Sequence, residues 1–235
     1  MGRPVSGYYT KDGRRLPSVT EVLGHFKNPD PLVNWGFRRG QESGYAAAKG
    51  LPATRSAHEE KTQAGQAGNI AHDMIENYIF RLSGKATAEY VYEGPKLPPG
   101  LMDKAIKGFE NGKRWLAGSA LTVVDTEVSL VSERYGFGGT RDVRFVDPAG
   151  RNRLGDWKTS RAIYADYLLQ LGAYAILSEE CEGIIYDGGY DILRFSKEHA
   201  DFDHKFFLEL DDAKAAFLLL VQAYPLVEKL EARVR

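Results

Sequence analysis

Two short segments of the chain combine carboxylates with a lysine at a spacing that could support metal-assisted hydrolysis. Asp142 ends the stretch Gly138-Gly-Thr-Arg-Asp142, and Asp156 and Lys158 lie two residues apart in Asp156-Trp-Lys158-Thr-Ser160. Two carboxylates held close together repel each other unless a cation lies between them, and oxygen ligands of this kind suit Mg²⁺ or Mn²⁺. An ammonium group beside them could stabilise charge that develops on a phosphate or help to deprotonate water.

Strand alternation predicts that these three side chains lie on one surface. Successive residues of a strand point to opposite faces, and the apolar residues of both segments share the face that we expect to be the core face: Val143, Phe145 and Trp157. Asp142, Asp156 and Lys158 then gather on the other face, which we expect to be a solvated cleft. A three-residue loop at 148–150 would place Asp142 directly opposite Asp156, whereas a slip of one residue would separate them.

The same residues have a simpler interpretation. Strands often carry charges toward solvent, so an Asp–Lys salt bridge on an exposed sheet fits the pattern equally well. Glu127, on a predicted preceding strand, could reach the same surface as a further metal ligand.

Hydrophobic periodicity predicts the elements that hold these residues. Ser18 followed by Glu21 predicts a capped helix through His25, and Trp35 and Phe37 lie in a second short helical stretch. Apolar spacing predicts two further helices, at 69–82 and 102–117, and then a change of period. The remaining predicted elements are strands at 121–130, 137–146 and 153–158, a helix at 162–179, strands at 184–186, 190–195 and 206–210, and a last helix from Asp211, kinked at Pro225.

This order of elements predicts an α/β fold with a mixed β-sheet flanked by helices and a helical N-terminal portion. The length of 235 residues suits one domain, with residues 1–68 as a helical segment and 69–235 as the core.

The composition excludes several classes of protein. A net charge of −1 argues against a protein that coats nucleic acid, although the first 55 residues hold nine basic and four acidic side chains. That excess predicts a DNA path including Arg14, Arg15, Arg38 and Arg39, unless these are ordinary surface charges. The single Cys181 rules out an internal disulfide and a cysteine-ligated cluster. No apolar run is long enough to cross a bilayer, so we expect a cytoplasmic protein without membrane partners.

Taken together and in order, the motifs resemble the PD-(D/E)XK nuclease superfamily, and within it the RecB-like branch that includes phage exonucleases and the mitochondrial genome-maintenance exonuclease. The matching segments are Gly139-Thr-Arg-Asp142, Asp156-Trp-Lys-Thr-Ser160 and Gln170-Leu-Gly-Ala-Tyr174, with Pro17-Ser-Val-Thr20, Trp35, Gly68-Asn-Ile-Ala-His72 and Glu76 upstream. Arg141 stands where the superfamily's name has proline.

The resemblance implies a restriction-endonuclease-like core and a divalent-metal-dependent DNA exonuclease of phage-type recombination, replication or repair. Asp142, Asp156, the Trp157 carbonyl, His72 and Glu127 would bind Mg²⁺ or Mn²⁺, and Lys158 would be the catalytic lysine. Gln170 and Tyr174 would support the substrate or the catalytic strand. Thr159 and Ser160 would donate to a phosphate or cap the next helix.

Two other functions stay open, namely a structure-specific endonuclease and a nucleic-acid-binding protein that has lost catalysis. The chain has no phosphate-loop motif of a helicase. Any helicase, single-strand-annealing or replication partner would therefore be a separate chain, in a bacterial cell or a phage-infected host.

Overall fold

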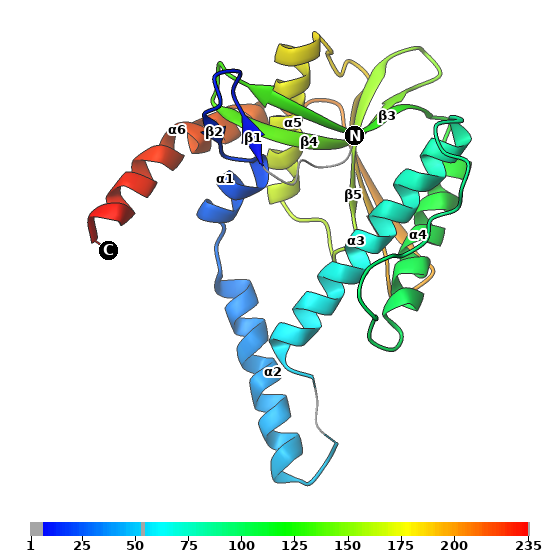
Figure 1. Ribbon diagram of the computed structural model, residues 1–235, viewed down its shortest axis with the longest axis vertical. Coiled ribbons are helices and arrows are strands. Elements are labelled where there is room, and N and C mark those ends of the chain that lie inside the picture. Colours follow the sequence, from blue (N-terminus) through cyan, green and yellow to red (C-terminus); the bar gives the residue numbers. More distant parts are fainter. Residues whose placement is uncertain (1–6, 53–54, 235) are drawn as a thin grey trace.

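The computed structural model describes residues 7–52 and 55–234 of the chain. The N-terminal half is mainly helical (Figure 1), and its elements are β1 (Tyr8–Tyr9), β2 (Arg15–Leu16), α1 (Val19–Phe26), α2 (Asp30–Ala48), α3 (Ala57–Leu82) and α4 (Leu101–Gly118). The C-terminal half contains β3 (Thr122–Ser132), β4 (Phe137–Val146), β5 (Asn152–Lys158), α5 (Asp166–Glu182), β6 (Gly189–Phe195), β7 (Phe202–Phe207) and α6 (Asp211–Val234).

Strands β3 to β7 form one five-stranded sheet in sequence order. Only β5 and β6 pair in parallel, and the connection between them contains α5; the other neighbours are antiparallel. The predicted α/β class, with a mixed sheet flanked by helices and a helical N-terminal portion, is confirmed.

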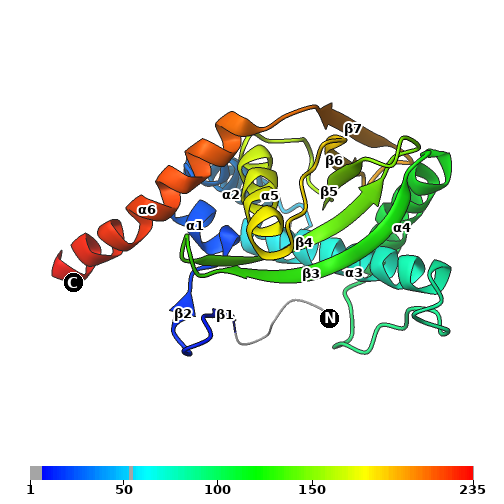
Figure 2. The ribbon, with the colours of Figure 1, turned by 90° about the horizontal axis from the view of Figure 1, so that it is seen from above.

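Helices cover both faces of the sheet (Figure 2). On one face α1, α5 and α6 pack against a core that includes Val22, Leu154, Leu177, Ile192 and Phe217. On the other face α3 and α4 pack against a second core built from Ile75, Trp115, Val143, Phe145, Trp157 and Phe195. Neither face is left open to solvent over its centre, which bears directly on the environment of the predicted site.

Several element boundaries differ from the prediction. α2 has 19 residues where a short stretch was expected, because its three internal glycines each weaken a helix by only about 1 kcal/mol. α3 begins twelve residues before the predicted start at residue 69, at a capping box of Ser56 and Glu59. The expected division at residues 68/69 therefore falls inside α3.

Smaller differences lie at the sheet margins. The β1–β2 hairpin was not predicted, and residues 184–186 form a loop in which the buried Tyr186 donates to Ser178. The last strand covers 202–207 rather than 206–210.

Two long helices extend away from the sheet, α2 on one side and the C-terminal part of α6 on another (Figure 1). Pro225 lies inside α6. In the part of the chain that the structure describes, each helix is too short or too polar to pass through a lipid bilayer.

Candidate active site

The β4–β5 hairpin brings the two predicted aspartates together. Its ladder runs from Val146↔Asn152 to Val143↔Gly155, and the same register sets Asp142 against Asp156, as the loop length predicted. The backbone N–H of Trp157 donates to Asp142 Oδ2 at 2.9 Å. Asp142 and Asp156 are 1% and 0% exposed, so this carboxylate pair lies inside the protein.

Lys158 lies on the same face of the sheet as Asp156. Its ammonium group forms an ion pair with Asp156 Oδ2, and the Lys158 side chain is 14% exposed. The ammonium also lies 4.9 Å from the ring centroid of Tyr167, at the start of α5. Trp157 points the other way, into the core under α3 and α4. The predicted alternation is thus confirmed within β5, but the predicted solvated cleft is wrong for Asp156, because α5 covers that face.

Burial leaves Asp156 with few groups to stabilise its charge. Its Oδ2 contacts the Lys158 ammonium, and its Oδ1 accepts no hydrogen bond from the described residues. Burial raises the pKa of Asp156 to about 7, with Lys158 opposing the rise and Asp142 adding to it. Burial acts against the charge of Lys158 as well, but Asp156 and Asp142 outweigh it and raise the pKa of the lysine. Lys158 therefore keeps its proton at neutral pH.

Strand β4 changes the face it presents at Asp142. A Cβ on Gly139 would touch Tyr174 of α5, and Arg141 bonds to Ser178 of α5. Two residues later Val143 packs into the core on the opposite face, whereas residues two apart in a regular strand share a face. Opposite the switch, on β3, Glu127 has φ of +51°, a left-handed conformation that costs about 1–2 kcal/mol for a residue with a side chain.

Arg141 anchors this irregular segment. It is the largest of the fully buried side chains, and its guanidinium donates to Asp125 Oδ1 at 2.9 Å and to Ser178 Oγ at 2.9 Å and pairs with Glu182. The Thr126 hydroxyl donates to the Asp142 carbonyl at 2.6 Å. These bonds hold β4 on both sides of Asp142, and this role of Arg141 was not predicted from the sequence.

The other two predicted side-chain ligands, Glu127 and His72, lie on β3 and α3 rather than on the β4–β5 hairpin. The β3–β4 register sets Glu127 across from Asp142, and Glu127 is buried. His72 lies on α3, the helix that covers the Trp157 face of the sheet. Among the residues that the structure describes, no three His, Cys, Asp or Glu side chains form a group that could hold a metal. The predicted four-side-chain set is therefore not preassembled, whereas the carboxylates of Asp142 and Asp156, with Asp156 Oδ1 free of hydrogen bonds from the described residues, fit a hard divalent cation.

The predicted supporting residues lie around the end of β5. Gln170 donates to the Tyr174 hydroxyl at 2.8 Å. Thr159 faces α3, where a Cβ on Gly68 would come within 2.5 Å of its hydroxyl. The Ser160 hydroxyl donates to the Ala162 carbonyl at 2.8 Å. Neither hydroxyl caps α5, because that helix begins at Asp166 with Ala165 as its N-cap residue.

Two residues next to the site, Tyr167 and Lys197, were not predicted from the sequence. Lys197 Nζ donates to the Ala64 carbonyl at 2.7 Å and lies 3.4 Å from the Thr159 hydroxyl. Burial lowers the pKa of Lys197 to about 8. Both residues meet the site through contacts between separate elements, although Tyr167 lies three residues before Gln170 and could have been noticed there.

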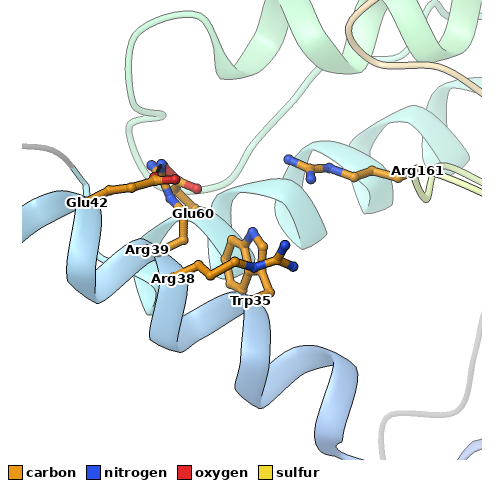
Figure 3. Close-up of a pocket in the computed structure, with 6 residues that line it drawn as sticks. All are labelled: Trp35, Arg38, Arg39, Glu42, Glu60 and Arg161. Atoms are coloured by element: carbon orange, nitrogen blue, oxygen red, sulfur yellow. Dashed lines mark hydrogen bonds and ion pairs between the residues drawn. The ribbon is translucent and has the colours of Figure 1, made fainter.

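A pocket of about 460 Å³ separates α2 from the loop after β5, and the lining residues are Trp35, Arg38, Arg39, Glu42, Glu60 and Arg161. Figure 3 shows Arg39 turned toward the two glutamates and Arg161 pointing across toward Trp35 and Arg38. Arg39 forms ion pairs with Glu42 and Glu60. Arg38 and Arg161 are exposed, and no carboxylate among the described residues pairs with them.

No family model matches the chain, and no curated protein matches its sequence. Several solved structures are similar in fold. SSO0001 is 16% identical with a TM-score of 0.38, and the match covers 55% of this chain and 61% of that one, so the similarity spans about three fifths of SSO0001.

Two similar structures are named as exonucleases. A provisionally named exonuclease from Eubacterium rectale is 11% identical, with a TM-score of 0.41 and coverage of 77% of this chain and 88% of that one. An alkaline exonuclease from Laribacter hongkongensis is 13% identical, with a TM-score of 0.33 and coverage of 69% and 86%. Identity and superposition are both low, so the function proposed below rests on the geometry of the site.

Proposed function

We propose that this protein is a divalent-metal-dependent DNA nuclease that hydrolyses phosphodiester bonds at DNA ends. The observation that carries the proposal is the buried pair Asp142 and Asp156 on adjacent strands, with Lys158 beside it. Buried charges in proteins are normally paired and hydrogen-bonded, and Asp156 Oδ1 accepts no hydrogen bond from the described residues.

A purely structural salt bridge accounts poorly for this arrangement. One ammonium group faces two buried carboxylates: it contacts Asp156 Oδ2, while Asp156 Oδ1 has no hydrogen-bond donor among the described residues. The pKa of Asp156 is raised because burial and the charge of Asp142 outweigh the attraction of Lys158. A divalent cation supplies the missing positive charge and prefers carboxylate oxygens.

Asp142 and Asp156, with the Trp157 carbonyl, would hold the cation, which when bound polarises water and a phosphate oxygen. The hydrogen bond from the Trp157 N–H orients Asp142 toward its partner. Lys158 is protonated, so it stabilises negative charge on the phosphate rather than accepting a proton. Thr159 and Ser160 follow directly after this strand, but Thr159 faces α3, and the Ser160 hydroxyl would have to leave the Ala162 carbonyl before it could donate to a substrate.

The pocket between α2 and the β5–α5 loop offers a path for the DNA backbone. Arg38 and Arg161 supply uncompensated positive charge there, in a protein whose net charge is −1. Arg39 is neutralised by its two glutamates, so we assign it to holding α2 on α3. Action on ends, in recombination, replication or repair, follows the motif resemblance, and a separate strand-opening or annealing protein would supply suitable ends.

The decisive test is to incubate the protein with end-labelled linear and circular DNA, single- and double-stranded, with Mg²⁺, with Mn²⁺ and with excess chelator. Cleavage of linear DNA that spares circles and stops in chelator is expected. Cleavage of circles would favour an endonuclease, and full activity in chelator would refute the role of the two aspartates.

A further inference from the structure

The loop between the catalytic strand and α5 presents an aromatic side chain that the proposed chemistry does not use. Tyr164 lies in this loop, five residues after Thr159, and is 48% exposed. Single exposed aromatic residues are common on protein surfaces. The position and support of Tyr164 are what distinguish it.

Tyr164 is connected to Lys158 through one intervening ring. The Lys158 ammonium lies 4.9 Å from the Tyr167 ring centroid, and the Tyr167 and Tyr164 centroids are 5.7 Å apart. The two rings meet at 77°, edge to face, which occupies at most one face of Tyr164. Tyr164 therefore lies on the far side of Tyr167 from Lys158, and about half of its surface is exposed to solvent.

The loop that carries Tyr164 makes contacts on both sides of the ring. Ile163 packs against the core under α5, whereas Tyr164 is half-exposed. The Lys27 ammonium pairs with Asp166, in the first turn of α5, at 2.7 Å. Arg161, three residues before Tyr164, lines the pocket that faces α2. One loop thus carries hydroxyl groups, a guanidinium and an aromatic face, the groups that bind phosphates and bases in single-stranded nucleic acid.

We propose that Tyr164 stacks on an unpaired nucleobase at a DNA end, with Tyr167 as its support, so that this protein prefers single-stranded or frayed ends to blunt duplex. The inference rests on the proposed function for its substrate. At a blunt end the terminal base is held in its base pair and stacked on one neighbour, whereas an unpaired base can turn out and stack on an aromatic side chain.

The test measures binding without turnover, in EDTA. Oligonucleotides with 2-aminopurine as the first or last base are titrated with the full chain, once single-stranded and once as a blunt duplex. Fluorescence quenching of the single-stranded probe at one end is expected. Tyr164→Ala should abolish that quenching and weaken single-strand binding about 5- to 100-fold, while blunt-duplex binding changes less than about twofold. Tyr164→Phe, which keeps the ring, should behave as the wild type.

Phe206→Ala is the matched control. Phe206 is 47% exposed, but it lies against Arg153 at the other end of β5, about 16 Å from Lys158 along the strand. It should leave both affinities unchanged. Unaltered single-strand binding by Tyr164→Ala, or an equal loss on single strand and duplex, would overturn the proposal.

Hydrolysis of bis(4-nitrophenyl) phosphate by the wild-type protein in Mg²⁺ tests the phosphodiesterase chemistry separately, since this substrate has no base. If neither this substrate nor end-labelled DNA is hydrolysed in Mg²⁺, the nuclease is refuted, while loss of quenching in Tyr164→Ala would still establish the stacking site.

Discussion

Replacing Asp156 with asparagine should make the metal-free protein more stable. The pKa of Asp156 is raised from 3.8 to about 7, which corresponds to about 4 kcal/mol as an upper limit. Because the pKa in the folded protein exceeds that in the unfolded chain, the stability of the wild type falls as pH rises from about 4 to about 7. Asparagine has almost the same shape as aspartate and no charge, so the variant avoids this loss. The pKa of about 7 for Asp156 already includes the attraction between its carboxylate and Lys158. Removing that attraction in the variant therefore adds no further loss of stability.

Urea unfolding followed by circular dichroism, in EDTA at pH 4 and pH 8, measures the effect. Asp156→Asn and the wild type should be about equally stable at pH 4, and the variant should be more stable by about 2–4 kcal/mol at pH 8. Mg²⁺ at pH 8 should stabilise the wild type and leave the variant unchanged, because a ligand stabilises the state that binds it. A variant that is less stable than the wild type at pH 8 would refute the reasoning, because Asp156–Lys158 would then be a structural ion pair.

Three further predictions concern Lys158, the α2 pocket and Arg141. Lys158→Met should lower kcat by about 100- to 1000-fold with little change in DNA affinity, while Lys229→Met, on the exposed side of α6, should not. Replacing Arg38 and Arg161 together by alanine should reduce the magnitude of the salt slope of DNA binding by about 2, and an unchanged slope would remove the pocket from the DNA path. Arg141→Met should cost about 3 kcal/mol or more in urea unfolding, and a loss below about 1 kcal/mol would show that its partners do not hold β4.

The hairpin that carries the site was predictable because its causes are local. Alternation in two strands and a loop at 148–150 are enough to set Asp142 opposite Asp156, and the structure has that register. The burial of the pair was not predictable in the same way. It depends on α5 lying over that face, and a strand with alternating polar residues looks the same in sequence whether a helix or solvent covers it.

The change of face in β4 at Asp142 could not be predicted from the neighbouring residues either. Arg141 is held by Asp125, 16 residues away, and by Glu182, 41 residues away, and no periodicity within β4 indicates such partners. Lys197 meets Thr159 across 38 residues for the same reason. The extent of α3 was missed differently, because residues 57–68 have little apolar periodicity and only the Ser56 capping box marks the start.

Helix α3 contacts both α2 and the residues that follow β5. α3 has 26 residues and is about 39 Å long; near its start Glu60 pairs with Arg39 of α2, and farther along Gly68 rests on Thr159. Through these contacts α3 links α2 to the C-terminal end of β5, so a displacement of α2 would be transmitted to the residues that follow Lys158. A chain that began at residue 69 would lose the buried Ala67 and the contact of Gly68 with Thr159 together.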